Sequence, residues 1–264
     1  ATFASNTSTI PIAEIAAGAR RPGRVLGMHF FSPVEKMPLL EIIPHAGTEA
    51  DSIVRAARFG RRMGKTVIVV ADRPGFWVNR ILTPYLNEAG ILLSEGVPID
   101  LIDRTMTRFG FPVGPVALLD EVGLDVGQKA SAVMPAAFGT RLTPSPVVTA
   151  MVADGRLGRK SGRGFYRYAD GKKQGVDPAA YTLLGVTPVP DAAPTMIEQR
   201  LVYAMLNEAA MAAAEGVVRS PRDGDIGAIF GIGFPPFRGG PLRMIDDLGA
   251  RRAADVLSQL AIAY

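Results

Sequence analysis

Apolar residues in the first 75 positions alternate between short continuous runs and stretches with helical spacing. The short runs predict strands at residues 2–4, 24–31, 39–45 and 66–72. Helical spacing predicts helices at residues 11–18 and 48–64, each of which ends at a glycine. The almost continuous apolar run at 66–72 is typical of a strand covered on both faces. This order of strands and helices predicts the later part of an α/β sheet.

Beyond residue 76 the pattern changes to that of helices. A long helix is predicted by seven apolar residues at helical spacing: Ile81, Leu82, Tyr85, Leu86, Ala89, Leu92 and Leu93. Pro84 is expected to kink or loosen this helix, because proline lacks a backbone donor. Residues 140–195 are rich in proline and glycine, and we expect a linker-like connection there, with one short ordered element at its start.

The helical pattern occurs twice. Residues 79–97 (NRILTPYLNEAGILLSEGV) match residues 199–217 (QRLVYAMLNEAAMAAAEGV) at a constant offset of 120 positions. Further along, FGFPVGPVALLD pairs with GIGFPPFRGGPLRMID across small insertions. The repeat predicts two helical units of common origin. We expect the second to be structural and to pack on the first, because neither has much of a core alone.

Composition narrows the class of protein. The chain has 264 residues, of which 48% are hydrophobic and 20% charged, and a net charge of +4, as in a folded protein. The absence of cysteine excludes disulfides and thiolate catalysis, and two histidines argue against a histidine-rich metal centre. The basic residues form no aromatic-interleaved stripe, so nucleic acid is not expected as a partner. The most apolar window, residues 201–218, contains two glutamates, and no membrane span is expected.

His29 and Glu41 are the candidates for acid–base chemistry. The predicted strand at 24–31 places His29 near its carboxyl end, where open α/β sheets bind ligands. If the next strand folds back beside it, Glu41 can bond one imidazole nitrogen and orient a general base that is competent near neutral pH. A purely structural histidine–glutamate pair fits the same spacing. His45 has no such partner in the sequence and is expected to be an ordinary surface residue.

Three polar residues near predicted helix starts are less specific. Ser8 and Thr9 precede the first helix, and either is expected to cap it. Asn79 follows a Pro-Gly turn at the start of the long helix, where an asparagine caps the helix or meets a polar ligand. None of these positions identifies a function by itself.

Five motifs occur in order along the chain: FASNTS, HFFSPVEKMPLLEI, DRPGFWVNRIL, GFPVGPVALLDEVGLD and GRKSGRGFY. Together they resemble the 3-hydroxyacyl-CoA dehydrogenase family over nearly the whole chain. The resemblance is to the dehydrogenase part of multifunctional fatty-acid oxidation α-subunits in particular, because single-function members generally lack a second helical unit such as residues 196–264. It implies NAD-dependent oxidation of (S)-3-hydroxyacyl-CoA to 3-oxoacyl-CoA in fatty-acid β-oxidation.

The resemblance also implies catalytic and substrate-binding roles. In that family a histidine at a strand end takes the proton from the substrate 3-hydroxyl while hydride passes to NAD⁺, and a glutamate orients the histidine. His29 and Glu41 occupy these two positions. Ser8 and Asn79 match a serine and an asparagine that contact the substrate.

The cofactor contacts that the resemblance implies are Ser8, Ser32 and Lys160. Lys160 matches a lysine in a glycine-rich turn near the cofactor, and Ser32 replaces an asparagine common in single-function members. The Gly-x-Gly-x-x-Gly fingerprint that receives the NAD pyrophosphate does not occur after a strand. We therefore expect a fragment without the glycine-rich half of the NAD-binding domain and without the upstream hydratase domain. Such a fragment is not expected to bind NAD⁺ usefully alone.

The expected fold is the C-terminal part of a Rossmann-like α/β NAD-binding domain at residues 1–75, followed by two homologous all-α domains at 76–185 and 186–264. The expected partners are an acyl-CoA substrate, further copies of the chain and a thiolase β-subunit. No signal peptide is expected, so the compartment would be the cytoplasm in a bacterium, or the mitochondrion or peroxisome in a eukaryote.

Two alternatives stay open. One is a non-catalytic helical module that joins the dehydrogenase to a thiolase-type partner. The other is a short-chain 3-hydroxybutyryl-CoA enzyme, against which the second helical repeat argues.

Overall fold

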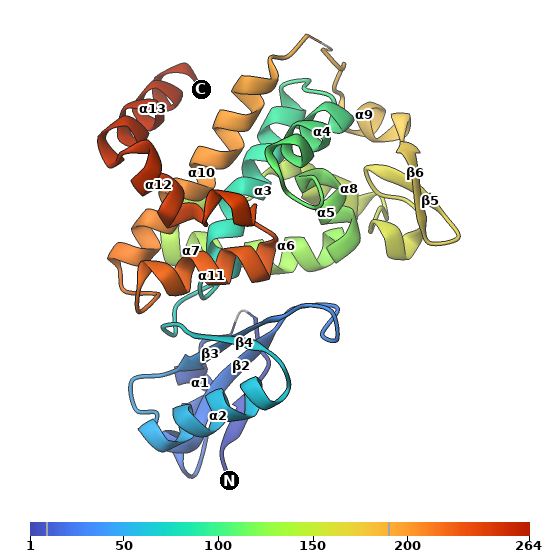
Figure 1. Cartoon of the computed structure of the whole chain (residues 1–264). Coiled ribbons are helices and arrows are strands. Elements are labelled where there is room, and N and C mark those ends of the chain that lie inside the picture. The colour runs from blue at the N-terminus through green and yellow to red at the C-terminus, as the bar shows by residue number, and fades with distance from the viewer. Residues whose placement is uncertain (9, 190) are drawn as a thin grey trace. The chain divides into compact units, whose positions relative to one another are not determined.

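The first 70 residues form a four-stranded mixed sheet in the computed structural model, which describes residues 1–8, 10–189 and 191–264 (Figure 1). The strands are β1 (Phe3–Ser5), β2 (Val25–Phe30), β3 (Leu39–Pro44) and β4 (Thr66–Val69), in that spatial order. β1 and β2 are parallel, β2 and β3 antiparallel, and β3 and β4 parallel. Helices α1 (Ile12–Ala17) and α2 (Ala50–Arg62) connect the parallel pairs. The predicted α/β arrangement is confirmed.

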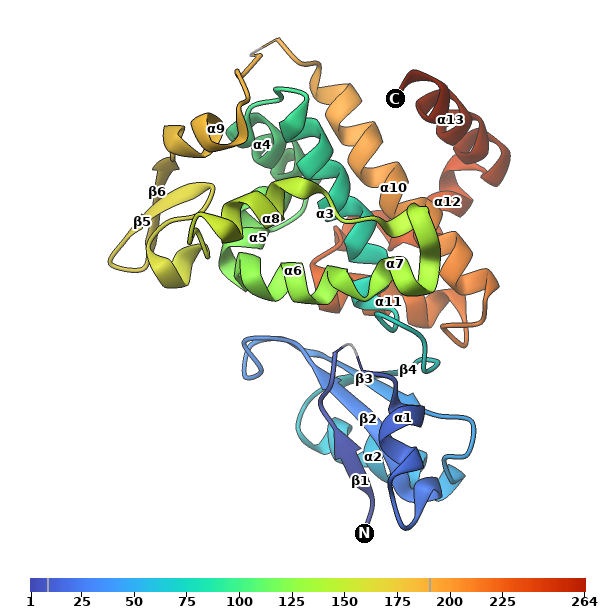
Figure 2. The ribbon, with the colours of Figure 1, turned by 180° about the vertical axis from the view of Figure 1, so that it is seen from behind.

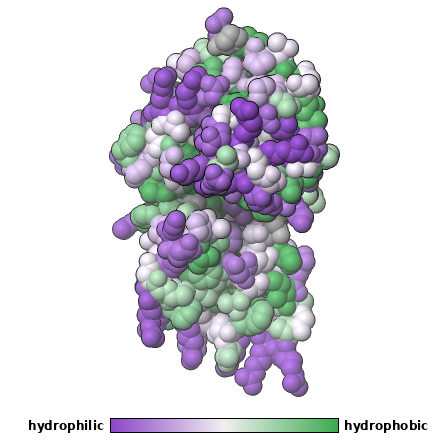
Figure 3. Space-filling model, turned by 90° about the vertical axis from the view of Figure 1, so that its right-hand side faces the viewer, coloured by the Kyte–Doolittle hydropathy of each residue, from purple (hydrophilic) through white to green (hydrophobic). Residues whose placement is uncertain are grey.

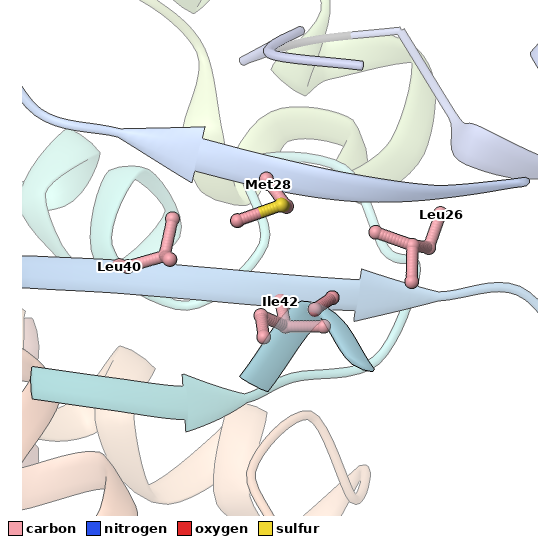
Figure 4. Close-up of a cluster of buried hydrophobic side chains, with 5 residues drawn as sticks. Leu26, Met28, Leu40 and Ile42 are labelled. Atoms are coloured by element: carbon pink, nitrogen blue, oxygen red, sulfur yellow. The ribbon is translucent and has the colours of Figure 1, made fainter. Parts of the chain in front are cut away.

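Alternation of side chains gives the sheet two different faces. Figure 4 shows one of them, an apolar cluster of Leu26 and Met28 from β2 with Leu40 and Ile42 from β3. Ala56 of α2 completes this cluster. Successive side chains of a strand point to opposite faces. His29, which follows Met28, and Glu41, which lies between Leu40 and Ile42, therefore point to the other face.

Helix α1 is capped by a residue distant in the sequence. The backbone N–H groups of Ile12 and Ala13 donate to Asp72 Oδ1 and Oδ2 at 2.9 and 2.8 Å. Asp72 therefore takes the place that the sequence analysis assigned to Ser8 or Thr9, and Thr9 lies outside the described residues. Local sequence did not reveal this cap, because Asp72 and Ile12 are 60 positions apart.

The remaining regular elements are mostly helical (Figures 1 and 2). The helices are α3 (Val78–Ser94), α4 (Ile99–Phe109), α5 (Pro115–Val122), α6 (Leu124–Ala132), α7 (Met134–Phe138), α8 (Pro146–Ala153), α9 (Pro178–Leu184), α10 (Pro194–Ala214), α11 (Pro221–Ile232), α12 (Pro241–Leu248) and α13 (Ala250–Ala263). Short 3₁₀ turns occur at Pro22–Arg24 (η1), Gly139–Leu142 (η2), Arg159–Ser161 (η3) and Pro236–Arg238 (η4). Helix α3 is the predicted long helix, and its assignment continues through Pro84 without a break.

The duplicated segments fold into the same order of helices, α3 to α6 in the first copy and α10 to α13 in the second. An internal contact also recurs. Asp103 in α4 accepts backbone hydrogen bonds from Val116 and Ala117 at the start of α5, at 2.9 and 3.0 Å. Asp225 in α11 accepts one from Leu242 at the start of α12, at 2.8 Å. A helix start held by an aspartate of the preceding helix in both copies supports their common origin.

By its internal contacts the chain divides into two compact units, one of residues 1–82 with 206–264 and the other of residues 83–205. The division cuts through α3 and α10, and it joins the later part of the second helical copy to the sheet. The domain boundaries expected from the sequence, at 75 and 185, stay a prediction.

The segment 140–195 is more ordered than the linker-like connection predicted for it. It contains α8, α9 and a two-stranded hairpin of β5 (Tyr166–Ala169) and β6 (Lys172–Val176). Buried charges hold it in place. Asp120 accepts hydrogen bonds from the backbone of Phe165 and Tyr166 at 3.0 and 2.9 Å, and burial raises the pKa of this carboxyl group to about 6. Arg156, 3% exposed, donates to Asp177 Oδ2 at 2.7 Å. Proline and glycine content does not reveal such networks.

Helix α11 of the second copy packs on the sheet. It contacts β3 and β4, and the backbone N–H of Ala71 donates to the Val217 carbonyl at 2.8 Å. The approach is close, because a Cβ atom at Gly227 would lie 2.8 Å from both Ile68 Cδ1 and Trp77 Cδ1. The second copy therefore packs on the sheet, a contact that was not predicted from the sequence.

Gly227→Ala is expected to lower the free energy of unfolding by about 1–3 kcal/mol, because an added methyl group overpacks this contact. Gly127→Ala in α6 is the matched control. There the new Cβ would meet Leu119 Cδ2 at an ordinary 3.6 Å, so the better helix propensity of alanine should stabilise by about 0.5–1 kcal/mol. Urea denaturation of both variants measures the difference, and equal effects would contradict close packing of α11.

Candidate active site

His29 and Glu41 are direct partners in the antiparallel pair of β2 and β3. Nδ1 of His29 and Oε2 of Glu41 lie 2.7 Å apart, and the two residues are 5% and 0% exposed. The hydrogen bond expected from the sequence is thus present. A carboxylate can only accept, so Nδ1 carries the proton, and in the neutral imidazole Nε2 then keeps its lone pair.

The second carboxylate oxygen of Glu41 is held by the start of α3. Oε1 accepts hydrogen bonds from the backbone N–H groups of Trp77 and Val78, at 3.2 and 3.0 Å. The first N–H groups of a helix have no partner within the helix, and the helix dipole favours a negative charge there. Both Glu41 oxygens are therefore engaged, which fixes the plane of the carboxylate and with it the imidazole ring.

Two aromatic rings flank the imidazole. The ring centroids of Phe31 and Phe76 lie 4.5 and 5.6 Å from that of His29. Phe76 has φ = 49°, in the left-handed region, and is 1% exposed. A bulky residue keeps such a conformation only where its surroundings impose it, and such residues cluster at functional sites. The roles of Phe76, Trp77 and Val78 were not predicted from the sequence, although the Pro-Gly turn before them is a signal of unusual backbone.

Ser8 and Ser32 follow the carboxyl ends of β1 and β2. Since these strands are parallel, both serines lie at the sheet edge where His29 is located. Asn6 Oδ1 accepts a hydrogen bond from the Phe30 backbone at 3.0 Å and ties the two strand ends together. Asn79 is the second residue of α3, directly after the turn that holds Glu41. One compact unit thus contains His29 and Glu41 together with the candidates Ser8, Ser32 and Asn79.

Lys160 belongs to the other unit, residues 83–205. It lies in η3 and forms an ion pair with Asp125 of α6. The hydrogen bond and the charge of Lys160 lower the pKa of the Asp125 carboxyl group. The cofactor role of Lys160 stays a prediction.

His45 is a structural residue of a loop rather than an ordinary surface residue. Its Nδ1 accepts a hydrogen bond from the Gly47 backbone at 3.1 Å, and its Nε2 therefore donates to the Pro22 carbonyl at 2.9 Å. Both ring nitrogens are occupied. Among the hydrogen bonds of the described residues, those of His45 occupy both ring nitrogens, whereas that of His29 occupies Nδ1 and leaves Nε2 for proton transfer.

Neither a metal-binding cluster nor a membrane-spanning helix is found among the described residues. Residues 1–8, 10–189 and 191–264 contain no cluster of three or more histidine, aspartate or glutamate side chains placed to hold a metal ion. Within the same ranges, no helix combines the length and the apolar character needed to cross a membrane. On the face shown in Figure 3, hydrophilic and hydrophobic residues are intermingled.

Two family models match the chain. The NAD-binding domain of 3-hydroxyacyl-CoA dehydrogenase matches residues 1–73, and the C-terminal domain of 3-hydroxyacyl-CoA dehydrogenase matches residues 75–168. The first contains His29 and Glu41, and the second begins at the Pro-Gly turn before α3.

Solved structures give the same assignment. The 3-hydroxybutyryl-CoA dehydrogenase of Escherichia coli K12 is 27% identical with a TM-score of 0.85, and the match covers 100% of this chain and 72% of that one. (S)-3-hydroxybutyryl-CoA dehydrogenase of Ralstonia eutropha is 41% identical (TM-score 0.62), with 64% of this chain and 61% of that one covered. The dehydrogenase part of multifunctional enzyme 1 from C. elegans is 29% identical (TM-score 0.61), with 89% and 54% covered.

The E. coli match changes one inference from the sequence. It covers the whole chain, including the second helical copy, so this copy also occurs in a protein described as a 3-hydroxybutyryl-CoA dehydrogenase. The second copy therefore does not distinguish the multifunctional form from such an enzyme. The general assignment is unaffected: the chain belongs to the 3-hydroxyacyl-CoA dehydrogenase family of NAD-dependent oxidoreductases, as its motifs indicate.

Proposed function

We propose that this chain provides the catalytic base of an enzyme that oxidises (S)-3-hydroxyacyl-CoA to 3-oxoacyl-CoA with NAD⁺. The observation that carries the proposal is the buried bond between His29 Nδ1 and Glu41 Oε2, at 2.7 Å, close to the carboxyl end of β2. The descriptions of the E. coli and R. eutropha proteins as 3-hydroxybutyryl-CoA dehydrogenases support a CoA thioester as the substrate.

His29 acts as the general base. Its Nε2 takes the proton of the substrate 3-hydroxyl as the C3–H bond breaks, and C3 becomes the carbonyl carbon of the 3-oxo product. The imidazole gains a positive charge in this step, and the neighbouring Glu41 carboxylate stabilises it. Asn79, at the start of α3, contacts the substrate together with Ser8.

The nicotinamide end of the cofactor is proposed to bind at this edge of the sheet. Ser8 and Ser32 both follow the carboxyl ends of parallel strands, the edge at which open α/β sheets bind dinucleotides. Their hydroxyl groups can donate to and accept from a carboxamide. When bound there, NAD⁺ supplies the hydride acceptor. Lys160 is proposed as a further contact to the cofactor.

Fatty-acid β-oxidation is the proposed metabolic context. The resemblance to multifunctional α-subunits and the match to the dehydrogenase part of multifunctional enzyme 1 from C. elegans support it. A thiolase β-subunit and further copies of the chain are the proposed partners.

The test is the reduction of NAD⁺ at 340 nm with (S)-3-hydroxyacyl-CoA of increasing chain length, using a protein that contains this chain. We expect activity with the (S) isomer and none with the (R) isomer or with free 3-hydroxy acids. Activity limited to short chains would place the protein with the 3-hydroxybutyryl-CoA dehydrogenases and against a general role in fatty-acid oxidation. No NAD⁺ reduction with any of these thioesters would refute the proposal.

A further inference from the structure

The second helical copy is bonded directly to the first turn of α3. Arg80, 0% exposed, donates from Nε to Glu208 at 2.7 Å and from both terminal nitrogens to Glu215 at 2.7 and 2.8 Å. Trp77, also 0% exposed, donates from Nε1 to the Gly224 carbonyl at 2.9 Å. Glu208 belongs to α10, Gly224 to α11, and Glu215 to the turn between them.

The same turn of α3 holds Glu41. The backbone N–H groups of Trp77 and Val78 bond Glu41 Oε1, while the side chains of Trp77 and Arg80 bond the second copy. A helix start has no intrahelical bonds from its first N–H groups, so the groups around it determine its position. The left-handed backbone of Phe76, directly before this turn, also requires external support.

We propose that the second helical copy is a positioning element for the His29–Glu41 pair. Glu208 and Glu215 act through Arg80, and the α11 backbone acts through Trp77, to hold the first turn of α3 against the Glu41 carboxylate. His29 thereby keeps the ring orientation and the tautomer that base catalysis needs. The catalytic role of His29 rests on the proposed function, but the effect of the second copy on the position of the His29–Glu41 pair does not. This role goes beyond the structural cover expected from the sequence.

The duplication provides a matched control. Arg200, the counterpart of Arg80, donates to Glu88 at 2.5 Å and to Glu95 at 3.0 Å. We call each arginine with its two glutamates a clamp: Arg80 with Glu208 and Glu215, and Arg200 with Glu88 and Glu95. The Arg200 clamp has the same chemistry but lies in the other unit, and Gln199 takes the place of Asn79 there. Glu88→Gln with Glu95→Gln therefore weakens an equivalent contact without touching the turn that holds Glu41.

The test measures hydrogen exchange of the imidazole Nδ1–H of His29 by NMR of histidine-labelled protein. The chain has two histidines, and His45 is the internal reference. Glu208→Gln with Glu215→Gln is expected to speed the exchange of His29 Nδ1–H by about tenfold, the effect of 1.4 kcal/mol on the opening equilibrium. His45 should not change, and the Glu88→Gln, Glu95→Gln variant should leave His29 as in the wild type.

An equal change of His29 in both double variants, or no change in either, would overturn the proposal. If the Glu208→Gln, Glu215→Gln variant does not fold, Trp77→Phe decides, since it removes the indole N–H bond to Gly224 together with the part of the ring that packs against Gly224 of α11. Faster exchange at His29 then supports the coupling, and unchanged exchange overturns it. The readout needs no substrate, so a failed dehydrogenase assay and a failed coupling are distinguishable.

Discussion

His29→Ala is expected to lower kcat by a factor of about 10²–10⁴ in the active dehydrogenase that contains this chain, the share that a general base contributes. KM for the acyl-CoA should change little, because the base acts on the reacting proton and not on the bulk of the substrate. Steady-state kinetics of NADH formation at saturating NAD⁺ measures both constants.

Glu41→Gln separates proton transfer from packing. A glutamine can still accept from Trp77 and Val78 through its carbonyl oxygen, but its NH₂ group then faces His29 Nδ1. This favours the tautomer that carries its proton on Nε2, so kcat should fall although the volume of the side chain is unchanged.

His45→Ala is the control for both variants. His45 ties a loop through Pro22 and Gly47, so its removal should affect stability more than turnover. Near-normal kcat in His29→Ala would transfer the role of base to another group, and loss of kcat in His45→Ala would show that the assay reports folding rather than chemistry.

The sequence contained enough information for the His29–Glu41 pair. Two apolar runs separated by a short turn predict adjacent strands, and side-chain alternation then decides which residues share a face. Leu26 and Met28 pack towards α2, which leaves His29 on the other face, opposite Glu41 in the register. Such reasoning works because it needs only local periodicity and one turn.

The contacts that hold this pair were not predictable in the same way. Trp77, Val78 and Asp72 act on residues 36, 37 and 60 positions away in the chain. A backbone N–H group has no sequence signature, and an aspartate that caps a distant helix resembles any surface aspartate. The order within residues 140–195 was missed for a related reason, since Asp120 bonds the backbone of Phe165 and Tyr166 from 45 and 46 positions away in the chain.

Among the ion pairs described, loss of the Arg80 clamp should lower the free energy of unfolding most. Arg80→Met is expected to lower the free energy of unfolding by about 3–5 kcal/mol, the cost of removing one partner from a buried pair. Glu208 is only 1% exposed, so its carboxylate would stay without the guanidinium charge in surroundings that water does not reach. Denaturation in urea, followed by circular dichroism, measures the loss.

Arg200→Met tests whether burial of the carboxylate causes this cost. The two arginines are counterparts in the duplication, but the Glu88 side chain is 20% exposed, against 2% for Glu208. A carboxylate that reaches water loses less when its partner is removed. We therefore expect a smaller loss for Arg200→Met than for Arg80→Met, and a larger one would contradict this explanation.

Arg80→Met combined with Glu208→Leu should recover most of the stability that Arg80→Met loses. Replacing both members of a buried ion pair with apolar side chains of similar size is often neutral, because no uncompensated charge remains. Glu215 would keep its charge, but its side chain is 42% exposed and can be hydrated. If the double variant is as unstable as Arg80→Met, the loss comes from the shape of the arginine and not from its charge. If the double variant is stable but the exchange of His29 Nδ1–H remains fast, the ion pair serves to position the α3 turn rather than to stabilise the fold.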